Sequence, residues 1–371
     1  MNREAAFTYV EEVIRNFLTE GKLLTKEIYG NGHINDTFLI RYELPSGHGK
    51  KYILQRINTD VFRNPEELMD NILHVTSYLR SYIIKEGGDP ERETLSVICT
   101  IEGRPYFKDA NGYYWRLYNF IEDAVTYDIV KTPKDFYESA LAFGRFQRLL
   151  ADFPADTLHE TIPGFHDTKA RFERFLQVVK EDPLGRAKEV EAEIQFICGR
   201  RELAEILGAM QAVGELPLRV THNDTKLNNV MLDKETGKAV CVIDLDTVMP
   251  GLSINDFGDS IRFGASTGAE DERDLSKVSC SMELFDIYVK GFVEGCAGRL
   301  TKKEMMSLPL GSKVMTYECG MRFLTDYLEG DTYFRIHREK HNLDRCRTQL
   351  ILVADMENKW EEMNQIVRKY L

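Results

Sequence analysis

One stretch of the chain constrains its fold more than any other. Residues 220–232 predict a strand, a polar loop and a second strand, and residues 239–246 predict a third strand with an acidic end. The apolar runs are short and rich in β-branched residues, which favours strands over helices. Five of the polar side chains on these segments carry the argument: His222, Asp224, Asn229, Asp244 and Asp246.

The spacing of these side chains is that of a kinase catalytic loop: His222 and Asp224 stand one residue apart, and Asn229 follows after four more. In-line phosphoryl transfer needs an Asp that accepts a hydroxyl proton, together with hard oxygen ligands for Mg²⁺. Loop Asp and Asn residues also form turns and helix caps, but the spacing, the strands and the second acid agree. We therefore expect Asp224 to be the base, and Asn229 and Asp244 to bind magnesium. Asp246 either adds a ligand or caps the following turn.

Composition limits the class of partner. The 371 residues, 43% of them hydrophobic, suffice for two packed units. A net charge of −12 disfavours nucleic acids and anionic membranes. The chain has no apolar run of membrane-spanning length and no apolar signal core at its start, so we expect a cytoplasmic protein. Seven scattered cysteines without a Cys-x-x-Cys pair indicate free thiols, not disulfides or a zinc site.

The first third of the chain is rich in predicted strands. A leading helix is expected over residues 3–18 and a second helix after Asn64, its expected N-cap, with Pro65 at the first helical position. The apolar stripe of the second helix consists of Leu68, Ile72, Val75 and Leu79. Strands are predicted near residues 26–29, 36–42, 51–57 and 113–118.

From Pro133 onward the pattern is helical, and it ends in an amphipathic helix near residues 343–371. This change predicts an α+β, two-lobe fold with a small β-rich N-terminal lobe and a larger, mainly helical C-terminal lobe. We place the N-terminal lobe at 1–118, a hinge at 119–123 and the C-terminal lobe at 124–371. Within the hinge, Asn119 and Ile121 are the candidate nucleotide-binding residues.

A glycine turn between two predicted strands is the candidate phosphate loop. Its backbone N–H groups, at Gly30, Asn31 and Gly32, are placed to approach phosphates. The turn lacks the Gly-Lys-Ser/Thr ending of a Walker-type loop, which disfavours that class of enzyme. At its lip, His33 and Asn35 either contact the acceptor or make hairpin hydrogen bonds.

In the predicted strand near residues 51–57, Gln55 occupies the position where a protein kinase carries lysine. Either Gln55 contacts phosphate as a neutral donor, or Arg56 or Lys226 supplies the positive charge. Lys226 follows Asp224 by two residues, so it either screens the transferring phosphoryl group or is a surface lysine.

Two further segments have competing interpretations. His222 is expected to brace the loop and not to take part in chemistry. Asp256, Phe257 and Gly258 resemble the metal-binding triplet of protein kinases, but they do not follow the catalytic loop closely enough. We expect Asp256 to open a helix and to accept backbone N–H bonds from the loop. Asp259 and Arg262 either face the acceptor cleft or form an ion pair.

Longer strings of residues carry a resemblance to a known family. The chain resembles the N-acetylhexosamine 1-kinases, within the aminoglycoside phosphotransferase and choline kinase superfamily, from about residue 29 to beyond residue 349. In that family, too, glutamine replaces the strand lysine. The matching strings are Gly30–Asn35, Tyr52–Gln55, Thr221–Asn229, Ile243–Thr247, Asp256–Ser266, Glu318–Leu324 and Asp326–Asp331.

The resemblance implies a protein-kinase-like fold and ATP- and magnesium-dependent phosphorylation of N-acetylglucosamine and N-acetylgalactosamine at the anomeric oxygen, in amino-sugar salvage. It also implies that Arg322 and Tyr333 contact the sugar, whereas the residues alone indicate only a helix-surface charge at Arg322. The expected partners are ATP and a small sugar acceptor, and the oligomeric state is left open with a monomer favoured. The alternatives are a kinase of an aminoglycoside, choline or homoserine, and a non-catalytic nucleotide-binding scaffold.

Overall fold

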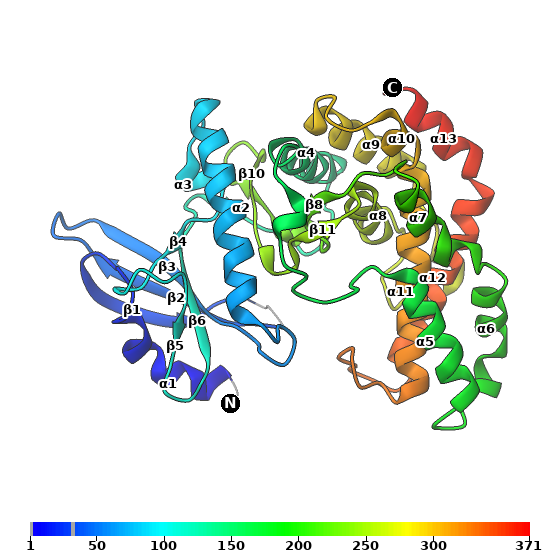
Figure 1. The fold of residues 1–371 in the computed structure, drawn as a ribbon, viewed down its shortest axis with the longest axis horizontal. Coiled ribbons are helices and arrows are strands. Elements are labelled where there is room, and N and C mark those ends of the chain that lie inside the picture. Colours follow the sequence, from blue (N-terminus) through cyan, green and yellow to red (C-terminus); the bar gives the residue numbers. More distant parts are fainter. Residues whose placement is uncertain (1–2, 31–33) are drawn as a thin grey trace.

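The computed structural model describes residues 3–30 and 34–371. Figure 1 shows a small strand-rich lobe beside a larger helical lobe, with the N-terminus on the first and the C-terminus on the second. The α+β, protein-kinase-like two-lobe fold predicted from the sequence is therefore confirmed. Within the described residues, no helix combines the length and the apolar character needed to cross a membrane.

The small lobe is built on an antiparallel sheet with strand order β1-β2-β3-β6-β4, and β5 also pairs with β6. Side chains alternate between its two faces. One face, with Phe38, Tyr52 and Trp115, packs against the first helix. The other face looks toward the large lobe. The elements are α1 (Arg3–Ile14), β1 (Lys22–Ile28), β2 (Asp36–Glu43), β3 (Gly49–Arg56), α2 (Pro65–Lys85), α3 (Pro90–Glu93), β4 (Val97–Ile98), β5 (Phe107–Lys108) and β6 (Tyr114–Asn119).

Helix α2 joins the two lobes, as Figure 1 shows. All four residues of its predicted apolar stripe are buried, and they share a core with Phe146, Val220 and Val248 of the large lobe. A division of the chain at residues 118 and 123 therefore stays a prediction, because this core draws on both sides of it. Pro65 begins the helix as expected, but in the described structure the Asn64 side chain makes no capping hydrogen bond.

The large lobe surrounds two small sheets, β10-β9-β7 and β11-β8, with helices. Its strands are β7 (Ala124–Val125), β8 (Arg219–Thr221), β9 (Val230–Asp233), β10 (Ala239–Val242) and β11 (Met249–Gly251). Its helices are α4 (Pro133–Leu149), α5 (Thr168–Glu181), α6 (Glu191–Cys198), α7 (Glu202–Ala212), α8 (Ser253–Gly264), α9 (Met282–Cys296), α10 (Lys302–Met306), α11 (Leu308–Glu329), α12 (His341–Asn358) and α13 (Trp360–Arg368).

The structure corrects two predicted helices. The leading helix ends at Ile14 and not at residue 18, because Phe17 pairs with Thr100 at the edge of the sheet. The last helix is two helices, α12 and α13, which meet at Lys359. The Lys359 ammonium donates to the Cys280 carbonyl at 2.9 Å and pairs with Asp355 at 2.8 Å, so the break is anchored to the start of α9.

Small residues set the distance between α8 and α11. A Cβ atom on Gly258 would lie 2.4 Å from the carbonyl oxygen of Gly311, so only glycine fits there.

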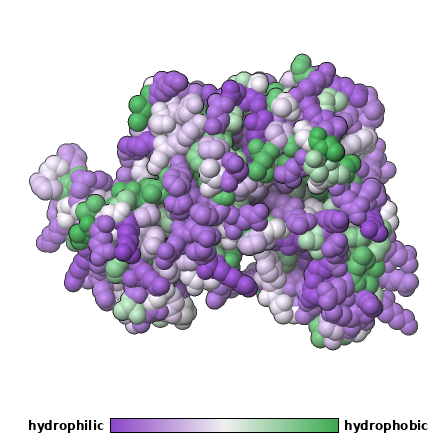
Figure 2. Space-filling view, in the orientation of Figure 1, coloured by the Kyte–Doolittle hydropathy of each residue, from purple (hydrophilic) through white to green (hydrophobic). Residues whose placement is uncertain are grey.

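The seven cysteines all lie in the described part of the chain and are free thiols, as predicted. Four of them are buried, whereas Cys198 is exposed. Hydrophilic side chains cover most of the face seen in Figure 2, with hydrophobic ones in small patches.

Candidate active site

A buried carboxylate holds the backbone of the candidate catalytic loop, which runs between β8 and β9. Asp256, in the first turn of α8, accepts the backbone N–H of His222 at 2.9 Å and that of Asn223 at 2.8 Å. The Gln147 amide donates to the same carboxylate at 2.9 Å. Burial raises the pKa of Asp256, while the bonds from the loop act against this shift. The prediction that Asp256 braces the loop is confirmed.

His222 also braces the loop, as predicted. Its ring is fully buried against the edges of Phe143 and Phe146. Nε2 lies 2.9 Å from the carbonyl oxygen of Ile243, so Nε2 carries the proton and Nδ1 accepts the backbone N–H of Asp224 at 3.3 Å. Both ring nitrogens are thereby used to orient the loop.

The three loop residues predicted to do chemistry lie together. Asp224 Oδ1 pairs with the Lys226 ammonium at 2.8 Å, and Asp224 Oδ2 accepts from the Asn229 amide at 2.9 Å. Burial opposes ionisation of Asp224, but Lys226 lowers the pKa of this carboxyl below its usual value. In turn Asp224 raises the pKa of Lys226. The Asp is therefore an ionised, weak base, suited to taking a proton late.

The acidic turn after β10 separates its two carboxylates. Asp246 is buried and forms an ion pair with Arg116, and its second oxygen accepts from the Asn35 amide at 2.6 Å. Asp244 has a left-handed backbone with φ of 60° and an exposed side chain. Partial enclosure by the surrounding protein, followed by the nearby carboxylates of Asp246 and Asp224, raises the pKa of Asp244.

This donor set fits a hard divalent cation. The Asn229 amide and the Asp244 carboxylate offer oxygen atoms, which Mg²⁺ prefers. The predicted third ligand, Asp246, is instead bonded by Arg116 and Asn35. The crowding of carboxylates that disfavours the ionised form of Asp244 is what a cation would relieve. Over residues 3–30 and 34–371, no group of three or more His, Cys, Asp or Glu side chains forms a metal cage. The fit therefore depends on the Asn229 amide and on bound water or phosphate.

The candidate phosphate loop is only partly described. Gly30 has a φ of 67°, whereas Asn31, Gly32 and His33 lie outside the described residues. Of the two alternatives for Asn35, hydrogen bonds within the glycine hairpin are not those observed: its amide donates to Asp246, and its oxygen accepts the backbone N–H of Asn58 at 2.9 Å. A contact with the acceptor stays a prediction. Asn35 thus links the small lobe to the acidic turn.

The hinge candidates differ in burial. The Asn119 amide donates to Glu91 of α3 at 3.0 Å. Ile121 is 4% exposed and packs with Ala124 and Cys241. α3 also holds this segment through Arg92, which pairs with Asp233 of β9 at 2.6 Å. The nucleotide-binding role of Asn119 and Ile121 stays a prediction.

Sequence reasoning missed Arg116, which lies on β6 directly opposite Gln55 of β3. The Arg116 Nε donates to Gln55 Oε1 at 2.9 Å. Arg56, one of the predicted sources of charge, pairs with Asp36, its Nε lying 2.8 Å from the carboxylate. One signal was available in the sequence: Arg116 is a lone charge within the apolar run from Tyr114 to Tyr118.

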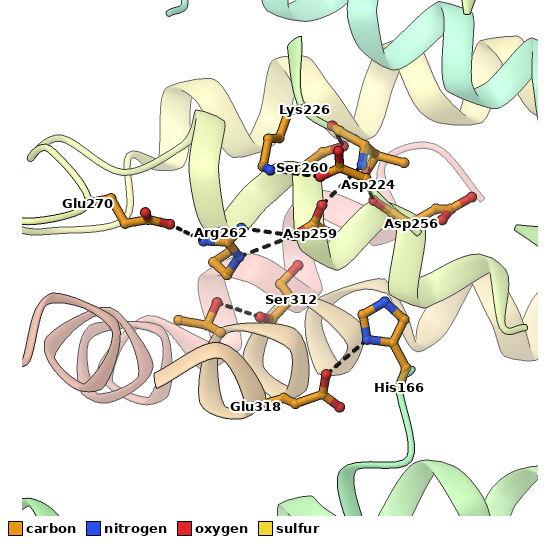
Figure 3. A network of polar contacts seen from close by, with 12 residues as sticks. His166, Asp224, Lys226, Asp256, Asp259, Ser260, Arg262, Glu270, Ser312 and Glu318 are labelled. Atoms are coloured by element: carbon orange, nitrogen blue, oxygen red, sulfur yellow. Dashed lines mark hydrogen bonds and ion pairs between the residues drawn. The ribbon is translucent and has the colours of Figure 1, made fainter. Parts of the chain in front are cut away.

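On the acceptor side, Asp259 and Arg262 form the ion pair that was one of the two predicted alternatives, at 3.0 Å. Asp259 also accepts the backbone N–H of Thr225 at 3.0 Å, and Arg262 continues to Glu270 at 2.9 Å. Figure 3 shows this buried chain directly beside Asp224. Asp259 therefore has a bracing role in the structure, and a sugar contact stays a prediction.

A second cluster surrounds Arg322 and Glu318 of α11, and Figure 3 shows its His166–Glu318 pair below this chain. The Arg322 guanidinium lies 5.5 Å from the Phe165 ring, 5.8 Å from that of Tyr333 and 5.4 Å from that of Phe334. One turn earlier, buried Glu318 pairs with His166 at 2.9 Å. Burial opposes ionisation of Glu318, but the positive charges of His166, Arg171 and Arg322 lower its pKa to about 2. The sequence motifs gave no sign of the His166–Glu318 pair.

Two cavities of the described structure lie away from the candidate site. One, of about 470 Å³, is lined by Cys296, Met305 and Tyr370 near the C-terminus. The other borders Gly21 and Pro45 at the far end of the small lobe. The candidate site lies where the two lobes meet, with Arg116 and Asn35 on one side and the acidic turn on the other.

Fold and loop geometry together define a phosphotransferase of the protein-kinase-like class. Residues 27–277, more than half of the chain, match the family model described as the phosphotransferase enzyme family. The chain belongs to this family and is a kinase of the aminoglycoside phosphotransferase and choline kinase-like superfamily.

Solved structures share this fold at low sequence identity. An aminoglycoside phosphotransferase from Alicyclobacillus acidocaldarius is 12% identical with a TM-score of 0.60, over 97% of this chain and 96% of that one. A microcompartment-associated aminopropanol kinase is 13% identical with a TM-score of 0.57, over 96% and 98%. An amicoumacin kinase in complex with AMP-PNP and Ca²⁺ is 11% identical with a TM-score of 0.54, over 97% and 94%.

Proposed function

We propose that this kinase transfers the γ-phosphoryl group of ATP to the anomeric oxygen of N-acetylglucosamine and N-acetylgalactosamine. In this proposal Asp224 orients the hydroxyl and takes its proton late, and Lys226 screens the charge of the transferring group. Asn229 and Asp244 hold magnesium, which neutralises phosphate charge when bound. The anomeric hydroxyl is the most acidic of a free sugar, which suits the weak base that Lys226 makes of Asp224.

The observation that carries the choice of acceptor is the charge of the α11 cluster. Two arginines, Arg322 and Arg171, and His166 lie around the buried carboxylate of Glu318. Such a surface repels cationic acceptors, among them aminoglycosides and choline. A guanidinium flanked by aromatic rings instead suits a neutral sugar, since the rings pack against C–H faces and the guanidinium donates to hydroxyl and acetyl oxygens. Arg322 and Tyr333 are the proposed sugar contacts.

A second candidate function is phosphorylation of a small amino alcohol or an antibiotic. It is favoured by the similar structures, which include an aminopropanol kinase and an amicoumacin kinase. Aminopropanol is cationic at neutral pH, so this candidate requires an acidic acceptor surface. The charge of the α11 cluster argues against it.

An acceptor panel distinguishes these candidates. Purified protein with Mg²⁺ and ATP is offered N-acetylglucosamine, its methyl glycoside, its 6-deoxy analogue, kanamycin and 1-amino-2-propanol, and products are followed by ³¹P NMR. We expect an anomeric phosphate from the free sugar and the 6-deoxy analogue, and none from the methyl glycoside. Phosphorylation of the methyl glycoside rejects the anomeric assignment, and turnover of the cationic acceptors alone rejects the sugar.

Arg322→Lys tests the sugar contact, with Arg104→Lys as a control, because the Arg104 side chain is 65% exposed. We expect the first variant to raise KM for the sugar at least about tenfold, because lysine cannot make bidentate bonds, while KM for ATP stays unchanged. A selective rise in KM for ATP would reject the proposed contact.

A further inference from the structure

A row of polar side chains crosses three strands of the small lobe. Thr37 of β2 lies opposite Gln55 of β3, and Gln55 lies opposite Arg116 of β6. Residues directly opposite in a sheet place their side chains on the same face. Arg116 Nε donates to Gln55 Oε1 at 2.9 Å, and Gln55 Nε2 donates to Thr37 Oγ1 at 3.0 Å. The Gln55 amide is therefore oriented by its neighbours on both sides.

This row ends at the acidic turn of the large lobe. The Arg116 guanidinium forms an ion pair with Asp246, and the two side chains are 2% and 4% exposed. Asn35 donates to the other oxygen of Asp246 at 2.6 Å. Two groups of the small lobe thus hold the carboxylate two residues beyond Asp244, so the position of the turn depends on both lobes.

Arg56 and Lys226, the other residues considered as the source of this charge, form ion pairs with other carboxylates. Arg56 follows Gln55 on the same strand, so its side chain leaves the opposite face of the sheet, where it pairs with Asp36. Lys226 pairs with Asp224. Arg116 is therefore the positively charged member of this row. It lies on β6, directly opposite the β3 position where protein kinases carry lysine.

We propose that Arg116 replaces the missing strand lysine as a positioning residue, holding Asp246 and with it the metal-binding turn against the small lobe. The positive charge stands on β6 instead of on β3, at the residue directly opposite Gln55. The hydrogen bond between Arg116 and Gln55 helps to orient the guanidinium. This inference rests on the metal role proposed above for the acidic turn. It does not depend on which acceptor the kinase uses.

The test exchanges the two positions. Variants Arg116→Met, Arg116→Lys and Gln55→Lys/Arg116→Met are compared with Arg104→Met, a control whose arginine side chain is 65% exposed and lies 3.8 Å from Glu102. Affinity for Mg²⁺·AMP-PNP is measured by calorimetry, and thermal unfolding is followed in parallel. Since nucleotide binding needs no acceptor, failure of the sugar assignment leaves this test intact. A wild-type protein that binds no Mg²⁺·AMP-PNP would instead reject the proposed function.

We expect Arg116→Met to weaken nucleotide affinity about 100-fold, because it leaves Asp246 buried without its cation. The exchange variant should recover at least about tenfold of that loss, and Arg104→Met should bind like wild type. A purely structural arginine would not be rescued by a lysine on another strand. An exchange variant that folds but binds no better than Arg116→Met overturns the proposal, as does wild-type affinity in folded Arg116→Met.

If the two variants that carry Arg116→Met both fail to fold, Arg116→Lys provides the test, because it keeps a positive charge beside Asp246. We expect it to bind Mg²⁺·AMP-PNP within about tenfold of wild type. A folded Arg116→Lys with affinity reduced more than about 100-fold overturns the proposal.

Discussion

Asp256→Asn separates a bracing carboxylate from a metal ligand. In the structure this carboxylate accepts three hydrogen bonds, from the backbone N–H groups of His222 and Asn223 and from the Gln147 amide. An asparagine oxygen can accept on one side only, and its NH₂ group then faces a backbone N–H. Asn223, at a φ of 64°, would lose the bond that holds its left-handed backbone.

The expected magnitude follows from these contacts. One unsatisfied buried N–H costs about 1–3 kcal/mol, and the opposed donor groups add to this cost. Removing the buried charge of Asp256 offsets part of this cost in stability, because burial raises the pKa of Asp256 and thus disfavours its ionised form. We expect a net destabilisation of about 2–4 kcal/mol, which lowers Tm by about 3–5 °C in a chain of this length. A loop displaced by about 1 Å should also lose about 100-fold in kcat.

The assays are thermal unfolding and a magnesium titration of kcat. The matched control is Asp274→Asn, an exposed cap that accepts the Ser276 N–H at 3.3 Å, which should change stability by less than about 0.5 kcal/mol. If Asp256→Asn kept wild-type Tm but required more magnesium for activity, Asp256 would be a metal ligand and the bracing interpretation would be wrong.

Three further predictions concern the loop, the acidic turn and the α8–α11 contact. Asp224→Asn should keep its fold and lose about 10²–10⁴ in kcat; retention of a third of wild-type kcat in a steady-state assay would contradict its role as base. Asp244→Asn should raise the magnesium requirement with Tm unchanged, whereas Asp246→Ala should lower Tm because Arg116 loses its buried partner; the reverse pattern in differential scanning fluorimetry would move the metal site. Gly258→Ala should destabilise by about 1–3 kcal/mol, since its Cβ meets the facing helix backbone at 2.4 Å, while Gly208→Ala, with open space around it, should stabilise by about 0.5–1 kcal/mol in urea unfolding.

Local spacing was enough to predict much of this protein. The spacing of Asp224 and Asn229 gave the loop, and it lies where expected between β8 and β9. The stripe on α2 was predicted from helical periodicity, and all of it is buried. The position of Asp256, too far along the chain to be the kinase metal triplet, correctly indicated a brace. The loop and the stripe depend on neighbours within a few residues or turns, and a sequence states such neighbours directly.

Tertiary structure alone decided which groups far apart in the chain meet in space. Arg116 and Asp246 are 130 residues apart, and Asn35 and Asp246 are 211 apart. His166 and Glu318 are separated by 152 residues. Spacing along the chain carries no information about such pairs, because the strand register, the packing of the two lobes and, for His166 and Glu318, the packing within the large lobe bring them together. The sequence therefore indicated the chemistry of the loop, whereas the position of the positive charge that replaces the lysine absent at Gln55 depends on how β6 pairs with β3.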